Sequence, residues 1–224
     1  MQLFMRTLRT TIIGLVVFGI LIFGPAGTLA YWQGWAFIAV FSISTTIIGV
    51  YLALKDPALL ERRMKVGPAA ETRPAQKIII SLSFMVFLVL VVASALDHRF
   101  GWSHVPAWIS VLGNVLVALG LMIDLRVFRE NSYGASTIER MDGQQVIATG
   151  PYALVRHPMY AGVLIMVLGI PLALGSWWGL LIVPATIPIL QLRIFDDEKM
   201  LRSELAGYGA YADRVRYRLV PGLW

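Results

Sequence analysis

The sequence predicts an all-α integral membrane protein, a bundle of five to six transmembrane helices whose last two form a tight helical hairpin. Composition gives the first indication: 58% of the 224 residues are hydrophobic and only 14% are charged. With a mean hydropathy of +0.72, the chain is typical of proteins that cross a membrane several times. The second indication is that the apolar residues fall into six segments, each near the ~20 residues needed to cross about 30 Å of hydrocarbon.

The six apolar segments cover roughly residues 11–30, 34–54, 77–96, 106–125, 159–175 and 177–195. Only the sequence GSWW separates the last two, and Pro171, Pro184 and Pro188 are expected to kink this hairpin. The prediction is a single membrane domain over residues 1–224. Residues 1–129 supply four spans and a connector, and residues 130–224 supply the last two spans and a tail.

The orientation of the bundle follows from the placement of lysine and arginine. If the N-terminus is cytoplasmic, every basic residue except Arg99 falls on the cytoplasmic side. We therefore expect a multi-pass protein with both termini and the polar loops in the cytoplasm. The net charge of +6 then reflects topology and contact with anionic lipids, not nucleic-acid binding. One alternative concerns residues 1–30, whose basic start and small-residue end also fit a cleaved signal peptide.

Two polar stretches between the spans predict local structure. In the connector, Asp56 is suited to cap a short helix that begins at Pro57, with Leu59 and Leu60 expected in the membrane interface. Residues 136–149 contain Asp142-Gly143 between β-branched residues, a pattern that favours a β-hairpin.

The tail after the sixth span has apolar residues at helical spacing, with charges of both signs between them. This pattern predicts an amphipathic cytoplasmic helix or pair of helices. Glycines at 207 and 209 are expected to break it.

Several chemistries are excluded by what the sequence lacks. The absence of cysteine excludes disulfides, thiolate nucleophiles and cysteine-ligated metal clusters. No Rossmann glycine loop, P-loop or nucleophile elbow is present. Of the three histidines, His98 and His104 fall on the outer side and leave only His157 inside, so no metal site is expected.

Ionisable and aromatic side chains gather at the cytoplasmic ends of the last two spans. The fifth span begins near Tyr152, Arg156, His157 and Tyr160, and the sixth ends near Arg193, Asp196, Asp197 and Glu198. The hairpin brings both ends to one face of the membrane, so we expect a single cluster there. Because ionisable groups are costly inside a bilayer, such a cluster indicates function. A snorkelling belt of arginine and tyrosine is the alternative.

Two motifs in these regions resemble a known family. The stretch GPYALVRHPMYAG (150–162), followed by RIFDDEKML and then GYGAYADRVRYRLVPGLW, resembles the isoprenylcysteine carboxyl methyltransferase family. Its members are integral-membrane enzymes that use S-adenosylmethionine, and membrane phospholipid methyltransferases are related to them. The resemblance covers about residues 130–224. One departure is visible, since the family usually has two glutamates where this chain has Asp197-Glu198.

The resemblance implies a cofactor site for S-adenosylmethionine formed by Gln145, Val146, Tyr152, His157, Tyr160, Asp197 and Glu198. Carboxylates suit the hydroxyl and ammonium donors of this cofactor, and tyrosine faces attract a sulfonium by ~0.5–2 kcal/mol. The backbone near Gln145 and Val146 would line the adenosine. Arg193 is implied to hold an acceptor carboxylate as the catalytic residue, with Arg156 as a second candidate.

The expected function is therefore methyl transfer to a lipophilic acceptor, first of all the carboxylate of an isoprenylcysteine-like substrate. A phospholipid amine or another small lipophilic acceptor is the first alternative. A non-enzymatic transporter or scaffold is the second, although a transporter would place ionisable groups near mid-membrane, where only Asp124 comes close. A nicotinamide-dependent membrane reductase is the third. Expected partners are the lipophilic or prenylated substrate and membrane lipids, and the oligomeric state is left open.

Overall fold

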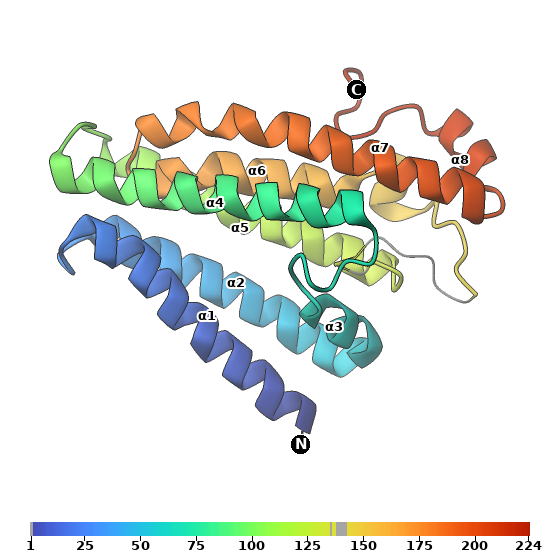
Figure 1. Cartoon of the computed structure of the whole chain (residues 1–224), viewed down its shortest axis with the longest axis horizontal. Helices are drawn as coiled ribbons and strands as arrows, with labels where there is room; N and C mark the ends of the chain where they lie inside the picture. The colour runs from blue at the N-terminus through green and yellow to red at the C-terminus, as the bar shows by residue number, and fades with distance from the viewer. Residues whose placement is uncertain (1, 135, 138–142) are drawn as a thin grey trace. The chain divides into compact units, whose positions relative to one another are not determined.

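A computed structural model describes residues 2–134, 136–137 and 143–224 (Figure 1). Throughout these described residues the regular secondary structure is helical, which confirms the all-α class. The chain divides into two compact units. Unit 1 comprises residues 1–50, 85–119 and 165–184, and unit 2 comprises residues 51–84, 120–164 and 185–224.

The long helices are α1 (Gln2–Ala26), α2 (Trp32–Lys55), α4 (Pro74–Phe100), α5 (Ala107–Glu130), α6 (Pro158–Ala173) and α7 (Thr186–Glu204). Short helices are α3 (Pro57–Met64), α8 (Tyr208–Arg214), η1 (Gly150–Ala153), η2 (Trp178–Leu181) and η3 (Val183–Ala185). Within the described part of the chain, α2, α4, α5 and the stretch Trp178–Glu204 are long and apolar enough to cross a membrane, and Ile12–Ala26 and α6 are shorter apolar helices. The prediction of an integral membrane bundle is thus confirmed.

Unit 1 is held together by aromatic and glycine contacts between apolar helices. Phe18 of α1 packs against Phe37 and Phe41 of α2, with ring centroids 6.0 and 5.0 Å apart, and the two helices lie side by side in Figure 1. Gly169 of α6 lies so close to α5 that an added Cβ would be 2.7 Å from the Gly113 carbonyl oxygen. Small residues at such crossings allow the close backbone approach typical of membrane helices.

The tight turn predicted between the last two apolar segments is present in unit 1. After α6, the Ser176 N–H donates to the Pro171 carbonyl at 2.8 Å, and Gly175 adopts a φ of +69° that favours glycine. Pro184 lies in η3 and Pro188 in the first turn of α7. The last segment therefore begins as short 3-10 helices, and the α-helix starts where its prolines no longer interrupt the hydrogen-bond ladder.

The connector helix α3 in unit 2 begins as its sequence predicts. Asp56 accepts a hydrogen bond from the Leu59 N–H at 2.9 Å, and Pro57 is the first helical residue. The expected placement of Leu59 and Leu60 in the membrane interface is wrong, because they are only 0% and 7% exposed. Burial against the protein removes these side chains from water without any lipid contact.

The C-terminal tail also forms helix, with a break near the glycines where the sequence predicts one. Gly207, at φ +85°, separates α7 from α8, whereas Gly209 lies inside α8. The apolar face of the tail is buried in a cluster that includes Leu205, Tyr208 and Val215. The β-hairpin predicted over residues 136–149 lies partly outside the described residues (138–142), and its described part, 136–137 and 143–149, contains no strand.

Candidate functional site

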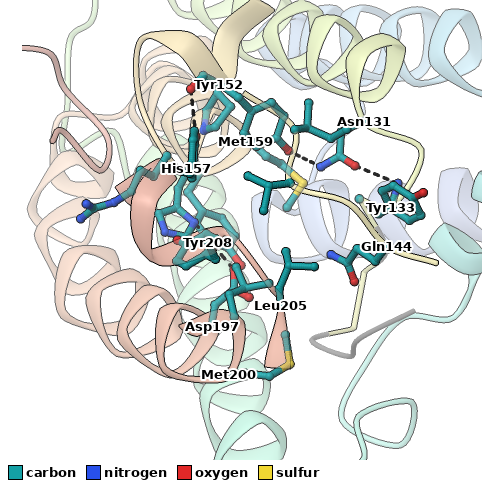
Figure 2. Close-up of a pocket in the computed structure, with 18 of the residues that line it drawn as sticks. Asn131, Tyr133, Gln144, Tyr152, His157, Met159, Asp197, Met200, Leu205 and Tyr208 are labelled. Atoms are coloured by element: carbon teal, nitrogen blue, oxygen red, sulfur yellow. Dashed lines mark hydrogen bonds and ion pairs between the residues drawn. The ribbon is translucent and has the colours of Figure 1, made fainter. Parts of the chain in front are cut away.

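Unit 2 contains an open pocket with a cavity volume of about 130 Å³. Figure 2 shows Asn131, Tyr133 and Gln144 along one side, Tyr152, His157 and Met159 along a second, and Asp197, Met200 and Leu205 along a third. The pocket also takes in most of the sequence-implied residues: Gln145, Val146, Tyr152, Arg156, His157, Tyr160, Arg193 and Asp197. Glu198, the remaining sequence-implied residue, does not line the pocket.

The turn before α6 is shaped by Gly150 and positions Tyr152. Gly150 has a φ of +56° and begins η1 against the Glu130 side chain. The Tyr152 hydroxyl accepts a hydrogen bond from the Asn131 side chain at 2.8 Å, and its carbonyl accepts one from the Tyr211 hydroxyl at 2.8 Å. Tyr152 is therefore fixed from the two opposite sides of the pocket.

Replacing Gly150 by alanine should destabilise the protein by about 1–3 kcal/mol, because a non-glycine residue at positive φ is strained. The added Cβ would also lie 2.9 Å from the Glu130 carboxylate. Unfolding of the purified protein in detergent measures this. The control is Gly209→Ala in α8, where an added Cβ meets nothing within 4 Å and alanine favours helix by up to ~1 kcal/mol. Equal losses of stability in Gly150→Ala and Gly209→Ala would contradict the inference that the backbone at position 150 requires glycine.

His157 joins the ends of α6 and α7. Its Nε2 lies 3.3 Å from Glu198 Oε1, and its Nδ1 lies 3.7 Å from Asp197 Oδ2. The ring also stacks on Tyr160, with centroids 5.6 Å apart and planes 17° from parallel. The expected meeting of His157 and Glu198 at one place is thus present, and Asp197 is the acid of the pair that borders the pocket.

Glu198 is buried among three cationic or protonatable side chains. Arg156 Nε lies 2.8 Å from its Oε1, and the Arg218 guanidinium approaches both carboxylate oxygens at 3.1–3.2 Å. Together with His157, these groups leave Glu198 only 5% exposed. A carboxylate held in this way positions its partners, and it does not itself face the pocket.

The tail segment after α8 pairs with the turn that carries Arg156 and His157. The Arg156 N–H donates to the Tyr217 carbonyl and the His157 N–H to the Arg218 carbonyl, both at 2.9 Å. The Arg156 side chain in turn donates to the Ala212 carbonyl at 3.0 Å. Arg156 is therefore engaged on its backbone and on its side chain, and its guanidinium holds the tail in place.

Arg193 borders the pocket from α7 and is 7% exposed. Its guanidinium makes five hydrogen bonds, as many as it has N–H donors. Nε donates to the Tyr160 hydroxyl at 3.1 Å, and the remaining donors reach Glu71, Gln76 and the Ser136 carbonyl at 2.8–3.2 Å. Arg193 and Tyr160 are thereby linked to the loop between α3 and α4.

Tyr152, Tyr208 and Tyr211 remain neutral at physiological pH because their pKa values are raised. Burial raises the pKa of Tyr152 to about 12, although its hydrogen bond with Asn131 acts in the opposite direction. Burial raises the pKa of Tyr208 and of Tyr211 as well, and the charge of Glu198 adds to both shifts. These tyrosines offer the pocket uncharged hydroxyls and ring faces.

Several pocket residues escaped the sequence reasoning. Asn131, Tyr133 and Gln144 belong to the segment before η1, part of which was predicted as a β-hairpin, and that pattern did not place their side chains at a pocket. Arg62 and Arg63 of α3 anchor this segment, donating to the Ser132 and Gly134 carbonyls at 2.7 and 3.0 Å. A basic residue between two apolar segments looks the same in sequence whether it binds a carbonyl or a lipid head group.

Comparison with known proteins gives one family match. Residues 108–204 match the family model described as phospholipid methyltransferase. The match runs from α5 to the end of α7 and includes Arg156, His157, Tyr160, Arg193, Asp197 and Glu198. It supports a membrane methyltransferase, and with the long apolar helices it supports an integral membrane protein. Comparison with curated proteins finds no match.

Proposed function

We propose that the pocket binds S-adenosylmethionine and that the protein transfers its methyl group to a lipophilic acceptor. The observation that carries this proposal is the meeting of Asp197, His157 and Tyr160 at one pocket, at the ends of the two helices that the family match spans. S-adenosylmethionine would supply a methyl group on a cationic sulfur. The pocket residues would bind this cofactor and orient its methyl group.

The pocket side chains suit the separate parts of this cofactor. Asp197, whose side chain is 19% exposed beside His157, can accept hydrogen bonds from hydroxyl or ammonium groups. Tyr152 and Tyr160 offer ring faces to a sulfonium. Gln145 and Val146 border the pocket from the segment before η1 and are proposed to line the adenosine. Glu198 acts on this site through His157 and Arg156, as a positioning residue.

Methyl transfer is a displacement in which the acceptor lies in line behind the methyl group. Holding two reactants in such a geometry can supply ~7–11 kcal/mol of the barrier. We place this site at the cytoplasmic edge of the membrane, by the positive-inside argument. A lipophilic acceptor can reach that edge from the bilayer, and the cofactor can reach it from water.

Two acceptor chemistries fit this site. A carboxylate, as on an isoprenylcysteine, would need a cation, and Arg193 is the pocket residue that would supply one. A phospholipid amine is the second candidate, and two observations favour it. The matching family is described by its action on phospholipids, and the Arg193 donors are already taken by Glu71 and its neighbours.

A labelled-methyl transfer assay tests the proposed function. The purified protein in lipid nanodiscs is given methyl-labelled S-adenosylmethionine and a panel of lipophilic carboxylates, phospholipid amines and phenols. We expect label in at least one extracted acceptor, and its chemical class identifies the substrate. No label in any acceptor, together with no binding of the cofactor by calorimetry, would favour a transporter or scaffold.

Replacing Arg193 by lysine should lower turnover by about 10–100-fold while the Kd for S-adenosylmethionine stays close to wild type. A lysine keeps one charge but replaces a planar fork of five donors by three, so the loop between α3 and α4 loses its fixed partner. Steady-state kinetics and calorimetry measure the two quantities. The control is Arg202→Lys, an exposed position on the same helix. Equal losses of turnover and cofactor affinity would move Arg193 into the cofactor site.

A further inference from the structure

The loop between α3 and α4 contributes a buried carboxylate that contacts Arg193, one of the residues lining the pocket. Glu71 is 3% exposed, and its Oε1 accepts hydrogen bonds from both terminal nitrogens of Arg193, each at 3.2 Å. We propose that Glu71 determines acceptor specificity, because it neutralises Arg193 and so disfavours an anionic head group. As far as the acceptor is concerned, this inference rests on the proposed function.

The end of the loop that carries Glu71 and the first turn of α4 contact α7 at a second place. Gln76, which is fully buried, accepts from Arg193 at 2.9 Å through its side-chain oxygen. Its amide nitrogen donates to Asp196, and Arg73 donates to the same carboxylate at 2.7 Å. Glu71 is therefore held by a loop with its own contacts, and its carboxylate cannot swing freely away from Arg193.

An anionic acceptor would have to compete with Glu71 for Arg193. If it displaced Glu71, it would leave a buried carboxylate without its counter-charge, which is strongly unfavourable. If it did not, it would face a paired arginine whose N–H groups are in use, with the Asp197 carboxylate also bordering the pocket. A neutral or amine head group meets neither obstacle. The arrangement thus discriminates by charge, as like-charge juxtaposition does at other binding interfaces.

The alternative is that Glu71 and Arg193 form a purely structural pair. Both interpretations expect some loss of stability when Glu71 is changed, so stability does not separate them. They differ in the binding of two ligands of the same shape and different charge. A structural role changes both affinities together, whereas a specificity role changes their ratio.

The test uses N-acetyl-S-farnesylcysteine, a lipophilic carboxylate, and its carboxamide, which has the same shape without the charge. The Kd of each is measured by equilibrium binding to the full-length protein in nanodiscs of fixed lipid composition. We expect the wild type to prefer the carboxamide. In Glu71→Gln the ratio of carboxylate Kd to carboxamide Kd should fall about tenfold, the lower end of what like-charge contacts cost. Comparing ratios between proteins cancels the different membrane partitioning of the two ligands.

The matched control is Glu61→Gln, which removes the same charge from an exposed position of helix α3. It should leave the ratio of the two Kd values unchanged. An unchanged ratio in Glu71→Gln, or equal weakening of both ligands, overturns the proposal. If that variant does not fold, the wild type alone decides, because a wild type that prefers the carboxylate overturns the proposal as well. Neither measurement uses the methyl donor, so failure here is distinct from failure of the labelled-methyl assay.

Discussion

Replacing Asp197 by asparagine is expected to weaken the binding of S-adenosylmethionine by about 10–100-fold. Hydrogen bonds to a charged group contribute ~1.5–3 kcal/mol, and each 1.4 kcal/mol is a factor of about ten in Kd. Asp197 is the carboxylate that borders the pocket, 3.7 Å from His157 Nδ1. Asparagine keeps the size of the side chain and removes only its charge, so a loss of affinity reports the contribution of the carboxylate charge. Calorimetry on the purified protein measures it.

The neighbouring acid provides a control on the same helix. Asp196 binds Arg73 and Gln76 and does not border the pocket. Asp196→Asn should therefore lower stability while the Kd for the cofactor stays close to wild type. If Asp196→Asn weakens cofactor binding as much as Asp197→Asn does, the two acids have been assigned to the wrong surroundings.

Replacing Glu198 by glutamine should lower the free energy of unfolding by about 3–5 kcal/mol, because removing one partner of a buried ion pair leaves the others uncompensated. Arg156, His157 and Arg218 all depend on this carboxylate, which is 5% exposed. In a domain of this size the midpoint of thermal unfolding should fall by roughly 6–20 °C. Cofactor affinity should fall too, since His157 loses the contact that orients it.

Thermal unfolding and cofactor calorimetry, run on the same samples in detergent, measure the two effects of Glu198→Gln. The control is Glu204→Gln, which removes an exposed acid from the end of the same helix and should change neither quantity. A Glu198 variant with an unchanged midpoint would contradict the role of Glu198 as the buried partner of three side chains.

The sequence predicted the membrane helices well because spanning a bilayer requires long apolar stretches, and such stretches can be read directly. It also anticipated that His157 and Glu198 would meet, because a tight turn at GSWW forces the far ends of two helices together. Asp56 and Pro57 marked the start of α3 for a similarly local reason. Each of these predictions depends on chain length, hydropathy or a single cap.

What the sequence could not provide was the set of partners that come from loops. Nothing in the pattern around Glu71, in a loop, or Gln76, in the first turn of α4, separates an acid and amide buried against Arg193 from solvated ones, since loops have no periodicity that fixes a face. Likewise, nothing in the sequence distinguished Arg218, which contacts Glu198, from the other basic residues of the tail. The cofactor role assigned to Glu198 stays a prediction, and the structure refines it, because Asp197 lines the pocket whereas Glu198 does not.

The three consecutive acids of α7 also limit how the pocket can open. Successive residues of an α-helix point about 100° apart, so Asp196 reaches the connector loop, Asp197 borders the pocket and Glu198 reaches the tail. Turning α7 about its own axis would break all three attachments at once. Any adjustment of the pocket to a ligand is therefore expected to leave α7 in its place.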